Sequence, residues 1–424
     1  MVVNAEELGG FSGPVPVGVA VPAPAAEDAK PARPRVTFGM VYGESVDRMR
    51  ARGRGEERML PVPWAALARL YEGTDGGGVN REVLRPGVHV LVGGTGSGKT
   101  QVALELAYEA ALVGASVTYI GLELDRVGVV ARLMGIAMAR GKELATASQR
   151  WPERWSSLDW PKGDVSRAAL ERVDEEFRAR HLQALDGIRL ELGSGRDGFT
   201  ADDFGEVLQE VQKEATPGRP ALVVLDFLQL LGANPGVRDD REIRTRIARA
   251  AYAANNATMD GRVAVLLVSA TARDRYEALD GVKLGKLPRA AGLVGSGKES
   301  GEIEYSAASV LVMARPALDQ EMPAELKRLV GDKKWSSVRL IAVPKGRQGA
   351  GENEAGAWAL LGFDGGALYD IDPAGIRLRE AQAAGVSKPG EAGGSTGSTG
   401  SKGSKRGGQA AAAGEKEEDG GMFG

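Results

Sequence analysis

Gly-Gly-Thr-Gly-Ser-Gly-Lys-Thr, residues 93–100, directly follows the apolar run of residues 88–92. Glycines let the backbone turn tightly enough for its N–H groups to surround anionic oxygens. Residues 101–111 are apolar at helical spacing, so the loop is expected at the start of a helix, where unpaired N–H groups and the dipole favour a phosphate. The predicted phosphate-binding residues are Gly93, Gly94, Thr95, Gly96, Ser97, Gly98, Lys99 and Thr100.

The last two residues of the loop have specific predicted roles. Lys99 is expected to reach the β- and γ-phosphates of a nucleotide, and Thr100 to hold Mg²⁺. The sequence therefore predicts a nucleoside triphosphate site that uses Mg²⁺ as cofactor.

Composition limits the class of protein. The 424 residues are 43% hydrophobic, which is enough for a large core, and they contain no cysteine, which excludes disulfides and thiolate metal sites. No apolar run approaches the roughly 18 residues of a membrane span, so we expect no membrane contact and a cytoplasmic location. The net charge is −3, so any nucleic-acid binding must use a local patch or a channel built from several subunits.

Changes in composition divide the chain into five regions. Residues 1–35 are rich in Pro, Ala, Val and Gly and predict a disordered arm, and residues 36–59 form an Arg-rich linker or helix. We place the folded domain at 60–371, a linker at 372–386, and a low-complexity tail with an acidic end at 387–424. The Arg-rich region is compatible with a nucleic-acid or subunit contact and with a solvated helix face. The tail is compatible with a solubilising role and with docking of replication partners.

Strand-like and helical patterns alternate through the folded domain. Apolar runs typical of strands occur at 88–92, 117–120, 188–191, 221–225, 263–268, 308–313 and 338–343. Helical patterns occur at 101–113, 126–140, 201–214 and 241–257. Alternation of this kind predicts an α/β fold with a mostly parallel central sheet flanked by helices.

Two carboxylates follow predicted strands and complete the expected site. Asp226 ends the buried run 221–225, where an acid can support the Mg²⁺ shell opposite the phosphate loop. Glu123 follows the strand at 117–120, and ligands bind at the carboxyl ends of strands in α/β sheets. Glu123 is therefore placed to polarise a water for attack on the γ-phosphate, although a surface acid on a loop has the same pattern.

Four segments in order resemble the DnaB-type replicative helicases and the small hexameric plasmid helicases of the RepA type. Residues 119–124, Tyr-Ile-Gly-Leu-Glu-Leu, are followed by Arg132-Leu133, and residues 226–230 read Asp-Phe-Leu-Gln-Leu. Residues 298–307 read Lys-Glu-Ser-Gly-Glu-Ile-Glu-Tyr-Ser-Ala, and residues 344–349 read Pro-Lys-Gly-Arg-Gln-Gly. The resemblance covers about residues 60–370 and implies a RecA-like ATPase core that binds ATP at the subunit boundaries of a ring, most simply a hexamer.

The resemblance also implies roles for individual residues. It makes Glu123 the catalytic base, Asp226 a metal-assisting acid, and Lys345 and Arg347 cations that reach the neighbouring subunit's site. Lys298, Glu299 and Gly301 match the loop that follows the phosphates of single-stranded DNA. Contacts of that kind are independent of base sequence and sensitive to salt.

The chain departs from the family pattern in two places. Where the family has Ser-Gln-Leu-Asn-Arg after the fourth core strand, this chain has Ser-Ala-Thr-Ala-Arg at 269–273, so the glutamine that senses the γ-phosphate is missing and Thr271 is a candidate replacement. The residues before 60 are too few for the DnaB front domain, so its primase and loader contacts are not expected here.

One segment imitates the phosphate loop. Residues 292–299, Gly-Leu-Val-Gly-Ser-Gly-Lys-Glu, carry Glu299 where Ser or Thr is required, and no strand leads directly into them. We interpret them as part of the DNA-facing loop. The sequence as a whole predicts an ATP-driven helicase or translocase. A RecA-fold ATPase that is not a helicase and an ATP-gated DNA-binding scaffold remain alternatives.

Overall fold

The computed structural model describes residues 37–54, 56, 58–72, 81–140, 167–192, 198–216, 218–234, 242–284, 290–298, 303–304, 307–317, 327–328, 337–346, 358–364 and 366–371. By its internal contacts the chain divides into two units, Met1–Ile376 and Arg377–Gly424, and all described residues belong to the first. Glu299, Gly301 and Arg347, which the sequence assigns to the DNA loop and the trans-acting hairpin, lie outside the described residues. The predicted N-terminal arm and the predicted C-terminal tail also lie outside them.

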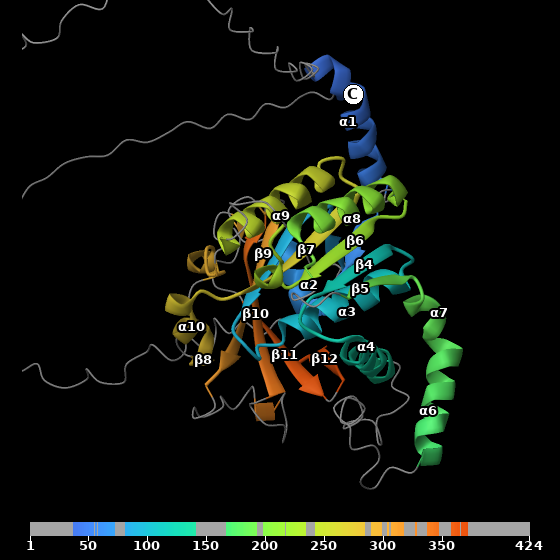
Figure 1. The fold of residues 1–424 in the computed structure, drawn as a ribbon, viewed down its shortest axis with the longest axis vertical. Helices are drawn as coiled ribbons and strands as arrows, with labels where there is room; N and C mark the ends of the chain where they lie inside the picture. The colour runs from blue at the N-terminus through green and yellow to red at the C-terminus, as the bar shows by residue number, and fades with distance from the viewer. Residues whose placement is uncertain are drawn as a thin grey trace, which may run out of the picture. The chain divides into compact units, whose positions relative to one another are not determined.

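Parallel strands form the centre of the main sheet, in the order β9-β3-β7-β6-β4-β5 (Figure 1). Their bounds are Gly87–Gly93 (β3), Ser116–Gly121 (β4), Ile188–Leu192 (β5), Ala221–Asp226 (β6), Val263–Ala270 (β7) and Ser309–Pro316 (β9). β6 and β7 are buried almost throughout because their side chains are apolar on both faces. In the register, Gly93 lies opposite Ala270 and Gly121 opposite Asp226, so these four residues meet at one edge of the sheet.

Antiparallel strands extend this sheet beyond β9. β10 (Val338–Gly346), β11 (Ala359–Asp364) and β12 (Ala367–Asp370) follow one another outward. The short β8 (Asp280–Val282) pairs with β9, and β1 (Leu60–Pro61) pairs with β2 (Glu82–Leu84) in a separate ribbon. The extension lies on the β3 side of the sheet and therefore flanks the predicted phosphate loop.

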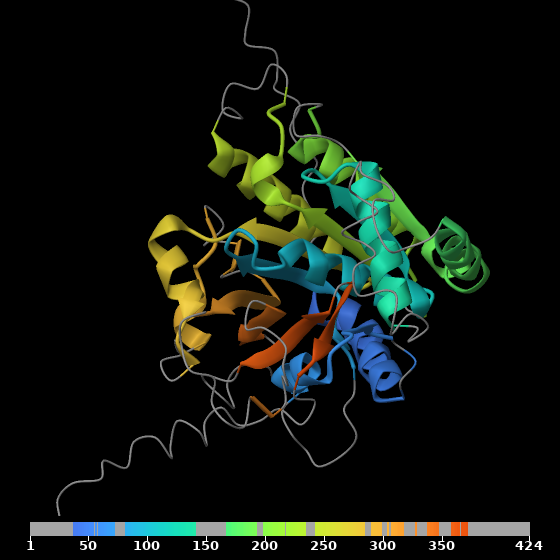
Figure 2. The same cartoon turned by 90° about the horizontal axis from the view of Figure 1, so that it is seen from below.

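Helices cover both faces of the sheet (Figures 1 and 2). α3 (Lys99–Leu112) packs with α4 (Arg126–Arg140) on one face, and α8 (Ala201–Glu214) packs with α9 (Ile243–Thr258) on the other. The crossovers β3-α3-β4 and β6-α9-β7 run in opposite directions along the sheet, and right-handed connections then place their helices on opposite faces.

The remaining helices are short or peripheral. They are α1 (Phe38–Gly53), α2 (Ala65–Glu72), α6 (Arg167–Arg180), α7 (Leu182–Leu185), α10 (Arg273–Leu279) and the 3₁₀ turns η1 (Leu228–Leu230) and η4 (Ala290–Leu293). In α1, the Arg48 guanidinium donates to the carbonyls of Asp260 and Gly261 at 2.7 and 2.9 Å. At least this arginine of the Arg-rich region therefore binds the chain's own fold. No helix among the described residues has both the length and the apolar character needed to cross a bilayer.

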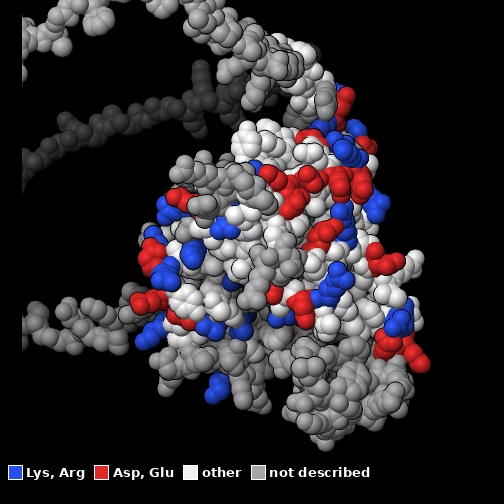
Figure 3. Space-filling model, viewed as in Figure 1, with Lys and Arg blue, Asp and Glu red and all other residues white. Residues whose placement is uncertain are grey.

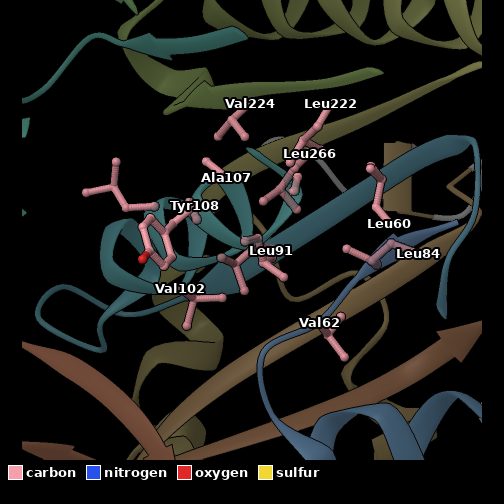
Figure 4. Close-up of a cluster of buried hydrophobic side chains, with 14 of the residues drawn as sticks. Leu60, Val62, Leu84, Leu91, Val102, Ala107, Tyr108, Leu222, Val224 and Leu266 are labelled. Atoms are coloured by element: carbon pink, nitrogen blue, oxygen red, sulfur yellow. The ribbon is translucent and has the colours of Figure 1, made fainter. Parts of the chain in front are cut away.

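The core on the α3 face of the sheet joins distant parts of the sequence (Figure 4). Leu91 of β3, Val102 of α3 and Leu222 of β6 are each almost completely buried in it, together with Leu60 and Val62 from the N-terminal end of the fold. A core assembled from several strands and their covering helices fixes the positions of the strand ends relative to one another. It therefore holds the functional edge of the sheet in place.

Every strand and helix predicted from the sequence is present, with ends that differ by a few residues. The α/β class with a mostly parallel sheet is confirmed. The prediction did not include α2, α6, β8, β11 and β12, and the three-residue β8 is too short to show a period. It also did not foresee that β10 to β12 run antiparallel.

Candidate nucleotide site

The phosphate loop joins the end of β3 to the first turn of α3, as its sequence predicts. Gly96 and Gly98 have φ angles of 71° and 101°, a region that side chains with a Cβ rarely adopt. Gly98 occupies the N-cap position of α3, and because glycine has no side chain, no side-chain hydrogen bond caps the helix. The first N–H groups of the helix are therefore left for an anion.

Lys99 lies folded back on its own loop. Its Nζ donates to the carbonyl oxygens of Gly93 and Gly94 at 2.8 and 3.0 Å. Burial lowers the pKa of Lys99, while the negative charges of Asp226 and Glu123 oppose this shift. A phosphate group would offer the ammonium negatively charged acceptors in place of these two neutral carbonyls, and opposite charges attract strongly at this distance.

Asp226, at the end of β6, is 1% exposed. Its Oδ2 accepts a 2.7 Å hydrogen bond from the hydroxyl of Tyr119 on β4. Burial raises the pKa of Asp226, while hydrogen bonding by Tyr119 and Thr100 and the charge of Lys99 act in the opposite direction. Its Oδ1 is buried and has no hydrogen-bond partner in the described part of the chain.

An unpartnered buried carboxylate oxygen beside a hydroxyl is a suitable place for a hard cation, which prefers oxygen ligands. Thr100 and Asp226 therefore fit Mg²⁺, as the sequence predicts. In the described residues no cluster of three or more His, Cys, Asp or Glu side chains provides a metal cage. Mg²⁺ usually takes one or two protein ligands and completes its shell with water and phosphate oxygens.

Glu123 follows β4 and is exposed. β4 pairs with β6, and the amide of Leu122 donates to the carbonyl of Asp226 at 2.7 Å, so the main chain fixes Glu123 close to Asp226. It shares a cleft of about 650 Å³ with Lys99 and Thr100. The structure therefore brings Lys99, Thr100, Glu123 and Asp226 to one site from three separate segments.

The wider cleft is lined by residues that the sequence did not assign to it. Arg132 of α4, Ala270 at the end of β7, Arg339 of β10 and Phe363 of β11 all contribute to its wall. Its volume is in the range of small-molecule sites. With a cationic loop at the centre and both charged and aromatic groups around it, the cleft suits a molecule that is anionic at one end and planar at the other.

Two arginines of the extended sheet approach the phosphate loop. Arg315 of β9 lies with Nη1 3.5 Å from the point where a Cβ on Gly96 would stand, and Arg339 has Nε 3.7 Å from the same point on Gly98. Arg315 also pairs with both oxygens of Asp280 at 2.7–2.8 Å. Burial and the charge of Arg315 lower the pKa of Arg339. No local pattern marks these arginines, because they reach the loop only through the pairing of β9 with β3 and of β10 with β9.

The end of β7 touches the phosphate loop through its main chain. The amide of Thr271 donates to the carbonyl of Gly93 at 3.2 Å, and Thr271 Oγ1 is buried without a hydrogen-bond partner among the described residues. Thr271 is thus adjacent to the loop, as its proposed sensor role requires. Ala270 lines the cleft and carries no polar side chain.

Lys298 is half-buried and lies near the end of the glycine-rich segment 292–299 that resembles the phosphate loop. The amides of Gly295 and Gly297 in that loop both donate to the carboxylate of Glu304 at 2.7 Å. Because the chain's own carboxylate already takes these two N–H groups, they are not available to a second phosphate. Lys345, predicted to act on a neighbouring subunit, donates from Nζ to the carbonyl of Glu304 in its own chain at 2.9 Å.

The fold and the loop together define the class: the chain has a RecA-like P-loop core. No family model and no curated protein matches it. Among solved structures, the ATPase domain of a helicase aligns with a TM-score of 0.50 at 15% identity, over 78% of this chain and 99% of that domain. A DnaB-like replicative helicase, solved with its interactions with primase, aligns at 0.48 and 16% identity over 79% of this chain and 67% of the helicase. The RadB recombinase aligns with a TM-score of 0.40 at 16% identity, over 74% of this chain and 100% of the recombinase.

At these identities the likeness concerns the fold. We base it on the first of these structures, the isolated helicase ATPase domain, whose whole length this chain matches. The expected RecA-like core is thereby confirmed, and the resemblance to the DnaB type that the motifs carry is borne out at the level of the fold.

Proposed function

We propose that this chain is an ATPase that moves along single-stranded DNA, as a ring-forming helicase or translocase of the DnaB and RepA type. The observation that carries the proposal is that Lys99, Thr100 and Glu123 line one cleft, with the buried Asp226 interacting with Lys99 and Thr100 beside it. The order of the four family-like segments gives the proposal its direction toward a DNA motor.

Each residue has a distinct chemical task. The loop amides and Lys99 bind and neutralise the β- and γ-phosphates, while Thr100 and Asp226 hold the Mg²⁺ that neutralises phosphate charge when bound. The Glu123 carboxylate orients the attacking water and accepts its proton. Tyr119 keeps Asp226 oriented and charged through the bond to Oδ2.

A single chain leaves this site incomplete. Glu123 is exposed, whereas phosphoryl transfer benefits from exclusion of water and from further cations on the transferring group. We propose that Lys345 and Arg347 supply these cations to the adjoining subunit, in a homo-oligomer that is most simply a hexamer. In that case hydrolysis at each boundary is linked to movement between subunits.

We propose that Lys298, Glu299 and Gly301 contact the DNA strand. The face of the domain in Figure 3 carries acidic side chains over α8, with Lys and Arg scattered elsewhere. A local loop is then a more suitable DNA contact than this face. In the cell we place the protein in the cytoplasm, in plasmid, phage or mobile-element replication, with the C-terminal tail as a partner-docking segment.

One observation favours a second candidate, an ATP-gated DNA-binding scaffold with little turnover. Ala270 lines the cleft where a polar side chain could contact the γ-phosphate. A RecA-fold ATPase without helicase activity is compatible with the same feature. These candidates differ in strand displacement and in turnover number.

The test is strand displacement on forked duplexes with 5′ or 3′ tails, in the presence of ATP and Mg²⁺. The helicase proposal expects displacement from one tail polarity and its loss in Glu123→Gln. Glu210→Gln is the matched control, because Glu210 is an exposed glutamate on α8, on the opposite face of the sheet. DNA-stimulated hydrolysis without displacement would instead support the ATPase that is not a helicase, and slow, unstimulated hydrolysis would support the scaffold.

A further inference from the structure

A hydrogen-bonded bridge links the nucleotide cleft to the loop that carries Lys298. We use the name β7 bridge for residues 269–272 and 296–298. Within it, the amide of Lys298 donates to the carbonyl of Ala270 at 2.6 Å, and the amide of Ala272 donates to the carbonyl of Ser296 at 2.8 Å. Since Thr271 also bonds the carbonyl of Gly93, the bridge touches the phosphate loop on one side and Lys298 on the other.

Gln229 ties this bridge to the end of β6. It lies in the η1 turn that follows Asp226, and its side chain reaches across to the β7 bridge. Its Oε1 accepts from the amide of Ala270 at 3.1 Å. Its Nε2 donates to Ser269 Oγ at 2.9 Å and to the carbonyl of Lys298 at 2.8 Å. One side-chain amide therefore joins the metal-binding strand, the cleft wall and the candidate DNA loop.

The far end of the bridge is fixed separately. The buried carboxylate of Glu304 holds the amides of Gly295 and Gly297. Through its main-chain carbonyl, Glu304 also accepts from Lys345 on β10. The loop before Lys298 is thus held by an internal anion, so a displacement at its β7 side would move the loop as a unit.

The bridge also contains groups that another arrangement could satisfy. Thr271 Oγ1 and Ser296 Oγ are buried and lack a hydrogen-bond partner among the described residues. A buried hydroxyl without a partner costs free energy, and such atoms in a folded protein call for an explanation. Two of them in one short bridge are consistent with a segment that has a second arrangement when nucleotide is bound.

We propose that Gln229 is the positioning residue that transmits the nucleotide state of the cleft to the Lys298 loop. Gln229 lies after β6 and bonds the main chain of Ala270, where β7 itself carries no polar side chain. The inference rests on the proposed function, since the loop must bind DNA for the link to matter there. Coupling of two sites through a contiguous hydrogen-bond network requires an element with two arrangements, and its strength is a measurable free energy.

The experiment compares Gln229→Leu, Gln229→Glu and a matched control in the full-length protein. Gln229→Leu removes all three hydrogen bonds at similar volume. Gln229→Glu keeps the acceptor for the Ala270 amide but faces the carbonyl of Lys298 with another acceptor. The control is Gln212→Leu, because Gln212 bonds Asp260 beyond the opposite end of β7.

Two quantities are measured for each protein. The first is the ratio of the affinities for an oligo-dT strand with a non-hydrolysable ATP analogue and with ADP. The second is the difference in hydrogen–deuterium exchange between the same two nucleotide states for peptides covering 290–304. Nucleotide affinity, measured with a fluorescent analogue, shows whether the fold and the phosphate site are intact.

The inference expects Gln229→Leu and Gln229→Glu to reduce the DNA-affinity ratio by about fivefold or more, the lower end of typical allosteric coupling. The nucleotide-dependent exchange difference at 290–304 should be lost as well, while nucleotide affinity and Gln212→Leu stay unchanged. A wild-type ratio and exchange difference in both Gln229 variants would overturn the inference. If Gln229→Leu fails to bind nucleotide, the inference is judged on the DNA-affinity ratio and the exchange difference of Gln229→Glu.

The wild-type arm separates the two ideas. Absence of DNA binding in the wild-type protein would contradict the proposed function, whereas the exchange difference still tests Gln229 as the link. If neither nucleotide state alters exchange at 290–304 in the wild-type protein, the link itself is disproved.

Discussion

Removing the Tyr119 hydroxyl tests whether Asp226 is charged and buried in the folded protein. Tyr119→Phe deletes the 2.7 Å bond to Oδ2 and leaves a carboxylate whose other oxygen already lacks a partner among the described residues. Both side chains are about 1% exposed, so water replaces the bond poorly. A hydrogen bond to a charged group contributes about 1.5–3 kcal/mol. At about 2 °C per kcal/mol, Tm should fall by roughly 3–6 °C.

The loss should depend on pH, and the direction follows from the pKa of Asp226. Burial raises this pKa in the folded state. A carboxyl of this kind favours folding below its unfolded-state pKa, and that contribution is lost as the pH rises through the folded-state pKa. Tyr119→Phe raises the folded-state pKa further, so the stability loss is largest where Asp226 is ionised. As the pH falls through the folded-state pKa, the loss should shrink to the roughly 0.5–1.5 kcal/mol of a neutral hydrogen bond.

The assay is thermal and urea unfolding without nucleotide, from mildly acidic to mildly alkaline pH. Tyr71→Phe is the control, because Tyr71 is also buried and bonds a neutral partner, Ser309 Oγ, at 2.9 Å. At alkaline pH, Tyr71→Phe should lower the free energy of unfolding less than Tyr119→Phe does. If Tyr119→Phe lost no more stability than Tyr71→Phe, or lost equally at every pH, the reasoning about Asp226 would be refuted.

Three further predictions concern the phosphate loop. Lys99→Met should weaken ATP binding by about tenfold to a hundredfold, since charged hydrogen bonds contribute about 1.5–3 kcal/mol each, and fluorescent-nucleotide titration measures this. Arg339→Gln should raise the KM for ATP about tenfold, because the Arg339 side chain lines the cleft beside the phosphate loop. Thermal unfolding of the variant should stay cooperative. An unchanged KM would show that Arg339 does not contact the nucleotide. Gly98→Ala and Gly114→Ala should each destabilise the fold by about 1–2 kcal/mol, because both glycines have a positive φ. Only Gly98→Ala should also weaken nucleotide binding. Equal nucleotide affinity in the two variants would contradict this prediction.

How far the sequence predicts the site depends on how local each signal is. Lys99, Glu123 and Asp226 each follow an apolar run that folds as a strand, so their position at the carboxyl ends of the strands could be predicted from the sequence, while their roles stay predictions. Arg339 depends on the antiparallel extension, which no local pattern predicts. It reaches the phosphate loop only because β10 lies beside β9 in the folded sheet.

Gln229 illustrates the same limit from another direction. The sequence placed it in a family-like segment, but its role depends on partners 41 and 69 residues away. Such contacts are set by strand order, here β7 beside β6, rather than by spacing along the chain. The missing sensor glutamine was visible in the sequence at Ala270. The hydrogen bond from the Ala270 amide to Gln229, which lies in the turn after the adjoining strand β6, became visible only in the fold.

The two glycine-rich loops use backbone N–H groups in different ways, and the difference favours the proposed direction of coupling. The loop at 93–100 has no side-chain cap for its helix-start amides, so its ligand can be exchanged. The loop at 292–298 is occupied by Glu304, a carboxylate with 0% exposure that the chain cannot release without leaving a buried charge unpaired. A change of nucleotide therefore acts on a loop that can respond, and the β7 bridge transfers the response to a loop whose own geometry is fixed. Because Gln229 bonds both Ala270 at the end of β7 and Lys298 in the second loop, a shift of the strand end is expected to move that loop with it.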